Sequence, residues 1–188
     1  KDSYAETYAR ENNIPFEEID DSVIDLSKCE ITVKDMTYTG KEVKPAPVVK
    51  YAQKTLKKGV DYTVAYKNNI EVGTATVTLT GKGNFTGTKK LTFAINPKNV
   101  SISKLAAGTK QLSVQWTARE DVTGYEIEYG LNSKLKDGTT VRVKKAATAK
   151  KVIKGLKSGK KYYVHIRAYR KVGRKTYWSA WSKTKSTK

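Results

Sequence analysis

Short runs of alternating, β-branched or aromatic residues, most of them closed by a Gly or Asn turn, fill this chain from residue 28 onward. Between 28 and 97 the runs read CEITV, PVVKY, YTVAY, TATVTLT and KLTFAI. Runs of this length and period predict β-strands, and helix has almost no support in this segment. We therefore expect a mainly all-β chain, in which residues 28–97 form either a small sandwich or a β-grasp-like sheet.

Residues 98–188 continue the same rhythm. Turn residues at Gly108, Gly124, Asp137-Gly138 and Ser158-Gly159 punctuate the segment. The predicted strands lie near 100–105, 111–117, 123–129, 139–144, 148–153, 161–170 and 176–186. This spacing fits one sandwich domain.

The N-terminal stretch KDSYAETYARENN predicts a short helix. Asp2 or Ser3 can cap its start, and Asn12-Asn13 is a suitable stop because Asn tolerates left-handed backbone. One face of this helix would carry Tyr4, Ala5, Tyr8 and Ala9. The predicted organisation is a helix and linker at 1–27, a small β domain at 28–97 and a second β domain at 98–188.

The composition argues against catalysis. The chain holds one His and one Cys, too few for a zinc site, and a single Cys forms no internal disulfide. No run approaches the ~18 apolar residues that a membrane helix needs. Acid–base hydrolysis needs two carboxylates in a cleft, whereas Glu126 and Glu128 lie on a predicted outward strand face. The sequence predicts a non-enzymatic protein without cofactor or metal.

Positive charge is concentrated in the second half. The chain holds 37 Lys and Arg against 18 Asp and Glu, a net charge of +19, of which residues 98–188 carry +18, 28–97 carry +7 and 1–27 carry −6. A basic cluster surrounds the turn between the fifth and sixth predicted strands of the last segment. Its members are Lys144, Lys145, Lys150, Lys151, Lys154, Lys157, Lys160 and Lys161. Cations gathered in this way predict a polyanion-binding site, because binding releases counterions from the polyanion.

The candidate partners of this basic cluster are anionic cell-wall polymer, a host glycan such as mucin, or a host surface protein. Nucleic acid is disfavoured, although Tyr163 and Tyr169 would offer stacking surfaces, because Lys far outnumbers Arg and base readout prefers Arg. A plainer interpretation is that the lysines protect exposed strand edges from sheet-to-sheet association. In that case the chain is expected to be a monomer.

Four stretches of the last segment carry a family resemblance: LSVQW at 112–116, VTGYEIEY at 122–129, LKSGKKY at 156–162 and YYVHIRAY at 162–169. Together they resemble a fibronectin type III domain. The resemblance implies a sandwich with Trp116 in its core. It also implies a tyrosine corner, a turn that is hydrogen-bonded to a nearby tyrosine hydroxyl, with the spacing from Leu156 to Tyr162.

The strand predicted at 161–170 has a period of two. This period places Tyr162, Val164, Ile166 and Ala168 toward the core. Tyr163, His165, Arg167 and Tyr169 would then face outward. The single His is therefore expected to be a surface residue rather than a metal ligand.

The stretch WSAWS at 178–182 resembles the Trp-Ser-x-Trp-Ser box of cytokine-receptor fibronectin domains. That resemblance implies a cation–π ladder in which Arg167, and Arg142 from the fourth strand, interleave with Trp178 and Trp181. The ladder would stiffen the last strand; a ligand-binding face is the alternative. Membership of the cytokine receptors is disfavoured, because Cys29 alone cannot form their paired disulfides.

Two further resemblances concern the first half. YTGK at 38–41, LKKGVDYTV at 56–64, VGTATV at 72–77 and GKGNFTG at 81–87 resemble an immunoglobulin-like or related β repeat of Gram-positive (Firmicutes-type) surface proteins. SYAETYARENNIPFEEI at 3–19 resembles the closing unit of bacterial leucine-rich repeat proteins. Both imply a secreted or cell-surface protein. The chain opens on Lys without a leader, so we expect a fragment of a longer protein.

These features predict an extracellular spacer or stalk that presents upstream domains, with a role in cell adhesion. The alternative is an adhesive module whose basic cluster binds a polyanion or glycan. A binder should gather outward aromatics and cations on one patch, whereas a spacer should lock its aromatics into strands.

Overall fold

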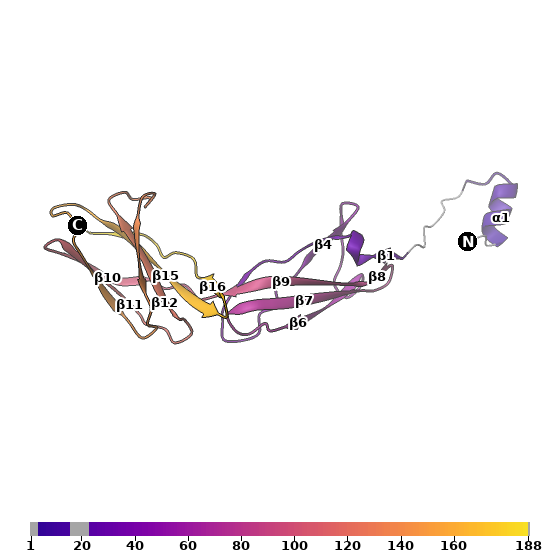
Figure 1. Ribbon diagram of the computed structural model, residues 1–188. Coiled ribbons are helices and arrows are strands. Elements are labelled where there is room, and N and C mark those ends of the chain that lie inside the picture. Colours follow the sequence, from indigo (N-terminus) through magenta and orange to yellow (C-terminus); the bar gives the residue numbers. More distant parts are fainter. Residues whose placement is uncertain (1–3, 16–22, 188) are drawn as a thin grey trace.

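The computed structural model of the protein describes residues 4–15 and 23–187 (Figure 1). It is mainly β with a short N-terminal helix, as predicted. Helix α1 spans Tyr4–Glu11, and the chain leaves it through Asn13 in left-handed backbone, with φ of 52°. The Tyr4 and Tyr8 rings stack with centroids 6.4 Å apart. The predicted caps Asp2 and Ser3 lie outside the described residues.

Residues 23–97 form two main sheets and a small parallel pair. One sheet has the order β2-β4-β5 and the other β3-β9-β7-β6, while β1 pairs with β8. The elements are β1 (Ile24–Asp25), the 3₁₀ turn η1 (Leu26–Lys28), β2 (Glu30–Thr32), β3 (Met36–Thr37), β4 (Val48–Tyr51), β5 (Lys54–Thr55), β6 (Tyr62–Lys67), β7 (Gly73–Gly81), β8 (Phe85–Thr86) and β9 (Thr88–Asn96). The five predicted strands appear as β2, β4, β6, β7 and β9. The two-residue strands were missed because they are too short to show a period.

The core of this unit follows from the alternation along β7. Ala75, Val77 and Leu79 point inward and are fully buried, and Phe93 and Ile95 of β9 pack beside them. Within 23–97 no α-helix covers a sheet, which a β-grasp-like arrangement would require. The two sheets enclosing one apolar core are instead the layers of a sandwich.

The segment before β4 is fixed by two tyrosines. Pro45 and Pro47 are buried, and their carbonyl oxygens accept hydrogen bonds from the hydroxyls of Tyr66 at 2.7 Å and Tyr62 at 3.4 Å. Both prolines precede the strand, where the N–H that proline lacks is not needed by the sheet.

Residues 102–186 form a second pair of sheets, ordered β10-β11-β14 and β13-β12-β15-β16, with β17 also pairing with β15. The strands are β10 (Ile102–Gly108), β11 (Gln111–Trp116), β12 (Gly124–Gly130), β13 (Thr139–Val143), β14 (Lys150–Lys154), β15 (Tyr163–Val172), β16 (Lys175–Trp178) and β17 (Lys185–Ser186). Their enclosed core contains Trp116, Tyr125, Ile127, Val164 and Ile166, each at most 3% exposed. Val164 and Ile166 lie in the core as the strand period predicted, and Trp116 as the resemblance implied.

Two expectations for this unit need correction. The strand predicted at 176–186 is interrupted, since β16 ends at Trp178 and β17 begins at Lys185. Tyr169, expected on the outward face, is only 3% exposed, because the Trp178 ring covers it with centroids 5.3 Å apart. Burial here comes from a side chain nine positions along the chain, which the period of β15 alone does not reveal.

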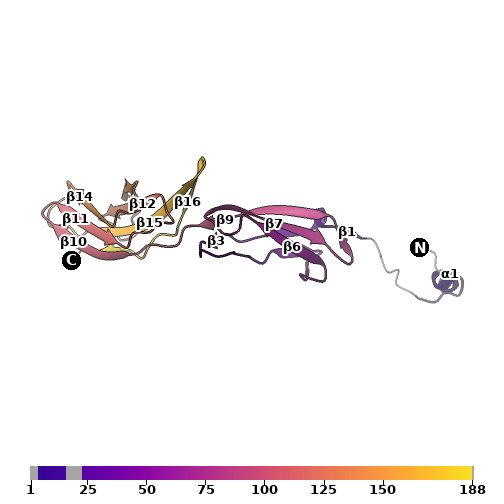
Figure 2. The same cartoon turned by 90° about the horizontal axis from the view of Figure 1, so that it is seen from below.

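The two β units lie end to end (Figures 1 and 2). Between β9 and β10, Pro97 is fully buried and Val100 belongs to the second core. Across the junction, the hydroxyls of Thr74 on β7 and Tyr177 on β16 are hydrogen-bonded at 2.5 Å. Gly73, with φ of 155°, faces Val172 at the end of β15. The junction is therefore a packed contact as well as a chain connection.

Candidate functional site

The outer face of the sheet β13-β12-β15-β16 carries a stack of alternating cations and rings. The Arg167 guanidinium carbon lies 4.0 Å from the Trp178 ring centroid and 4.2 Å from that of Trp181, so the cation lies against both indoles. The Arg142 guanidinium carbon lies 5.1 Å from the Trp178 ring centroid. The structure thus brings together the four residues expected for the ladder.

The stack is longer than the sequence suggested. The His165 ring lies parallel to the Trp181 indole, with centroids 3.9 Å apart and an interplanar angle of 11°. At the other end, Trp178 covers Tyr169. His165, Arg167 and Tyr169 alternate along β15, so the rung spacing follows from the period of one strand.

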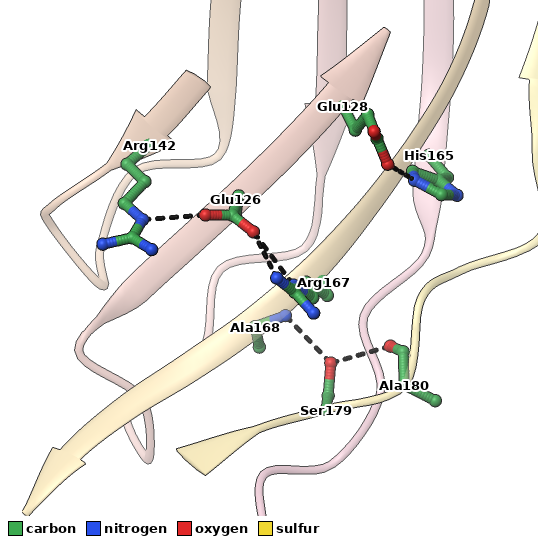
Figure 3. A network of polar contacts seen from close by, with 8 residues as sticks. All are labelled: Glu126, Glu128, Arg142, His165, Arg167, Ala168, Ser179 and Ala180. Carbon is green, nitrogen blue, oxygen red and sulfur yellow. Dashed lines mark hydrogen bonds and ion pairs between the residues drawn. The ribbon is translucent and has the colours of Figure 1, made fainter. Parts of the chain in front are cut away.

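The Glu126 carboxylate lies between the guanidinium groups of Arg142 and Arg167 and binds both (Figure 3). Its carboxylate accepts hydrogen bonds from Arg142 Nε at 2.7 Å and from Arg167 Nε at 3.0 Å, and its side chain is 5% exposed. Burial alone would raise the pKa of Glu126, but hydrogen bonds from Arg142 and Arg167 and their charges outweigh it and lower that pKa below its ordinary value.

The strand period predicts an outward position for Glu126, and the cross-strand pairing explains why this residue is nevertheless buried. Glu126 does face away from the core, but Arg142 of β13 and Arg167 of β15 are its direct cross-strand neighbours. Opposite charges at such positions are an available signal once the strand order is known. Glu128, one step further along β12, pairs in the same way with His165, whose Nε2 lies 2.6 Å from Glu128 Oε2 (Figure 3).

Strand β16 ends at Trp178, and beyond that point the two serines of WSAWS hydrogen-bond to β15. The Ser179 N–H donates to the Ala168 carbonyl, and the Ala168 N–H donates to Ser179 Oγ at 2.9 Å (Figure 3). Ser182 repeats the pattern with Ile166, whose N–H donates to Ser182 Oγ at 3.1 Å. The serine hydroxyls accept the hydrogen bonds that backbone carbonyls accept in regular strand pairing, so the predicted strand is interrupted here. The two indoles nevertheless remain over the outer face of the sheet.

The predicted corner lies at the opposite end of β15. The Tyr162 hydroxyl accepts a hydrogen bond from the Lys157 N–H at 3.0 Å, and Tyr162 and Leu156 are both buried. Trp116 packs against Tyr125 with ring centroids 5.1 Å apart. The Tyr162 hydrogen bond ties the turn between β14 and β15 to the core, whereas Trp116 and Tyr125 contact the segment between β13 and β14.

Removing the corner hydroxyl tests this arrangement. We expect Tyr162→Phe to lower the free energy of unfolding by about 1 to 2 kcal/mol, because the Lys157 N–H loses its acceptor in a partly buried turn. Urea unfolding followed by tryptophan fluorescence measures the change. Tyr163→Phe is the matched control, and an equal loss in both variants would contradict a specific role for the corner.

The basic cluster occupies β14 and the loops on either side of it. Lys150 and Lys154 alternate with Val152 on one face of this edge strand, while Lys144 and Lys145 precede it and Lys157, Lys160 and Lys161 follow it. Seven of the eight lysines are exposed, and Lys151 is half-buried. Lys161 Nζ lies 5.9 Å from the Tyr163 ring centroid. The cluster therefore follows one sheet edge and does not include the indole stack.

The part of the chain that the structure describes contains neither a candidate metal site nor a candidate membrane-spanning helix. Over these residues, no three His, Cys, Asp or Glu side chains are grouped as metal ligands. No helix of the described ranges has the length and apolar character to cross a membrane. Cys29 is buried, and that burial raises the pKa of its thiol.

A family comparison agrees with the fold of the second unit. Residues 96–185 match the family described as Fibronectin type III domain. A solved structure described as a myokine is similar over 50% of this chain and 94% of its own, with 21% identity and a TM-score of 0.37. The FN1–FN3 domains of chicken CNTN1 are similar over 84% of this chain and 65% of theirs, with 14% identity and a TM-score of 0.42. No curated protein matches the chain.

The family match covers the β10–β17 sandwich almost completely, starting two residues before the predicted boundary at 98. Within it lie the buried Trp116, the Tyr162 corner and the indole stack. Residues 96–185 are a fibronectin type III domain.

Proposed function

We propose that this chain is a non-catalytic spacer of an extracellular surface protein, which holds its flanking parts apart. The supporting observation is that the chain enters and leaves the paired β units at opposite ends. Ile24 pairs with Phe85 next to the end of β7 at Gly81, whereas Gly73, at the start of β7, lies at the junction. Ser186 pairs with Tyr163 at the start of β15, and Val172, at its end, meets Gly73.

The strand lengths give the span of this spacer. β7 has nine residues and β15 has ten. At a rise of about 3.3 Å per residue the two strands, laid end to end, separate entry and exit by roughly 60 Å. A chain arranged in this way keeps the segments attached at its two ends apart by the combined length of both β units.

The aromatic residues support the spacer over a ligand-binding face. Arg167 is enclosed between two indoles and bonded to Glu126, and His165 is stacked on Trp181 and bonded to Glu128. Groups that already satisfy one another have less to offer a partner, while their stack stiffens the last strands. Fibronectin type III domains are typically extracellular and non-catalytic, which fits this role.

The finer assignment rests on resemblance. We infer a bacterial, Gram-positive surface protein in which residues 1–27 close a leucine-rich repeat region and 28–97 are an immunoglobulin-like repeat. The motifs at 38–41, 56–64, 72–77 and 81–87 support it. The spacer would then present the upstream repeat region, with a role in adhesion.

A spacer of defined length requires a stiff junction. We expect the two β units to share one rotational correlation time in ¹⁵N relaxation measurements, because Pro97 is buried and Thr74 bonds to Tyr177. In the double variant Thr74→Val, Tyr177→Phe the correlation times should diverge.

The matched control for the junction is Thr80→Val with Tyr163→Phe. This double variant removes one threonine and one tyrosine hydroxyl that lie outside the junction contact, so it should leave a single correlation time. Independent tumbling of the two units in the unaltered protein would refute the stiff spacer.

A second function, polyanion binding, is favoured by one observation. Within the described residues, none of the eight clustered lysines forms an ion pair. Edge-strand cations left free in this way are available to an anionic wall polymer or host glycan. This function does not exclude a spacer.

Retention on an anionic surface tests the second function. We expect the protein to stay bound to bacterial walls that retain their anionic polymer, or to mucin, at about 150 mM salt. Replacing Lys150, Lys151 and Lys154 with Gln should release it, whereas replacing Lys58, Lys89 and Lys90 of the first unit should not. Loss of all retention at that salt would leave unspecific attraction and refute this function.

A further inference from the structure

A cavity of about 450 Å³ opens beside the end of β12, between the β12–β13 loop and the turn that follows β14. This volume lies in the range of about 300 to 1,000 Å³ typical of small-ligand sites. The cavity is separate from the indole stack and shares one residue, Lys157, with the basic cluster. Leu156 and Tyr162 of the corner also line it, so a rigid turn forms one of its walls.

The walls of the cavity are largely apolar. Tyr129 and Tyr162 contribute rings whose centroids lie 6.5 Å apart. Leu135 is 5% exposed, whereas Leu131 leaves 47% of its surface in solvent. An aliphatic side chain left open beside two rings gives a ligand an apolar surface to cover.

The rim carries polar groups that lack partners. Over the described residues, the Asp137 carboxylate, the Lys157 ammonium and the Asn132 side-chain NH₂ form no hydrogen bond or ion pair. All three residues are exposed, and each lines the cavity. A few free polar groups around an apolar floor are the usual make-up of a binding site.

These groups restrict the chemistry of a ligand. The Asp137 carboxylate only accepts hydrogen bonds, so it requires a donor, and it repels a polyphosphate. The Asn132 NH₂ and Lys157 require acceptors, and Lys157 favours an anion. A sugar ring offers an apolar C–H face and hydroxyls that both donate and accept. A carboxylate on that ring would supply the partner of Lys157.

We propose that this cavity binds one carboxylate-bearing sugar, a uronic acid residue, of an acidic glycan. The inference rests on the polyanion-binding function and names a subsite for it: the glycan runs along the basic edge at β14, and one ring enters the cavity. The sugar covers Leu131 and the Tyr129 ring, its hydroxyl donates to Asp137, and its carboxylate pairs with Lys157.

Calorimetric titration of the whole chain at about 150 mM salt tests the proposal. Two uronate probes are used: a galacturonic acid tetramer, and a hyaluronan tetrasaccharide in which glucuronic acid alternates with an amino sugar. The better of the two indicates whether the ligand resembles a wall or a host glycan. A neutral tetrasaccharide and inorganic tetraphosphate are the comparison ligands.

We expect at least one uronate probe to bind more tightly than both comparison ligands. Lys157→Gln and Asp137→Ala should each weaken it about tenfold, since the first removes the charge that pairs with the sugar carboxylate and the second removes the acceptor of the sugar hydroxyl. Lys150→Gln is the comparison variant: it removes one charge of the polyanion-binding cluster outside the cavity, so it should weaken binding as well, but by less than about threefold. The Leu131 methyl resonances should shift on uronate binding.

Equal weakening by Lys157→Gln and Lys150→Gln, or tetraphosphate binding as tight as uronate, would overturn the cavity site while keeping polyanion binding. Absence of binding by every anionic probe, together with loss of retention on walls and mucin, would refute both. All three substitutions are at exposed residues, so unchanged thermal unfolding should accompany each variant.

Discussion

Replacing Glu126 with Ala should lower the free energy of unfolding of the fibronectin type III domain by about 2 to 3 kcal/mol. The change leaves Arg142 and Arg167 without the carboxylate that neutralises them, and Arg167 is only 26% exposed. The value lies below that of a fully buried pair because the Arg142 side chain is 54% exposed and can turn to water. All three tryptophans belong to this domain, so urea unfolding followed by tryptophan fluorescence reports on it alone.

Glu126 should also make the stability of this domain depend on pH. Its pKa in the folded protein lies below the unfolded value of about 4.3. Its contribution is therefore fully present above that value and is lost as pH falls through the folded-state pKa. Between about pH 5 and pH 3 the unaltered protein should lose more stability than Glu126→Gln.

Glu120→Gln is the control for both experiments, since Glu120 is an exposed carboxylate of the same domain. If Glu120→Gln and Glu126→Gln flatten the acid dependence equally, the network around Glu126 is not its source.

The double variant Ser179→Ala, Ser182→Ala should cost about 2 to 4 kcal/mol. Each substitution removes the acceptor of a β15 amide, that of Ala168 or of Ile166, and both of these residues are fully buried. A buried N–H without an acceptor loses its hydration and gains nothing in return.

Hydrogen exchange gives a local readout for the same variant. The Ala168 and Ile166 amides should exchange faster, while the Val164 amide, which pairs within the sheets, should follow global stability. Ser158→Ala, at an exposed turn serine, is the control. Unchanged protection of both amides would mean that water or a shifted backbone replaces the hydroxyls.

The rhythm of short apolar runs and turns was enough to predict the β class and most of the long strands. β7 and β15 bury alternate residues as their period requires, because side chains of a strand point to opposite faces in turn. The resemblance of 156–162 and 178–182 to family motifs also named the residues of the corner and the stack. Strand period, turns and short motifs are local in the chain, so local sequence is sufficient to encode them.

The strand end at Trp178 shows what periodicity could not reveal. WSAWS satisfies β15 through serine hydroxyls instead of backbone carbonyls, a choice that depends on the partner strand lying alongside. Tyr169 likewise has the period of an outward residue and becomes buried when Trp178 folds over it.

Electrostatic and cavity features belong to the tertiary structure for the same reason. Glu126 becomes a buried acceptor because strands beginning at 139 and 163 place arginines on both sides of it. The cavity beside β12 joins a loop near residue 132 to a turn near residue 157. The sequence by itself determined which residues alternate and where the chain turns. Which of them meet was decided by strand order, since contacts between distant segments exist only after the sheets have paired.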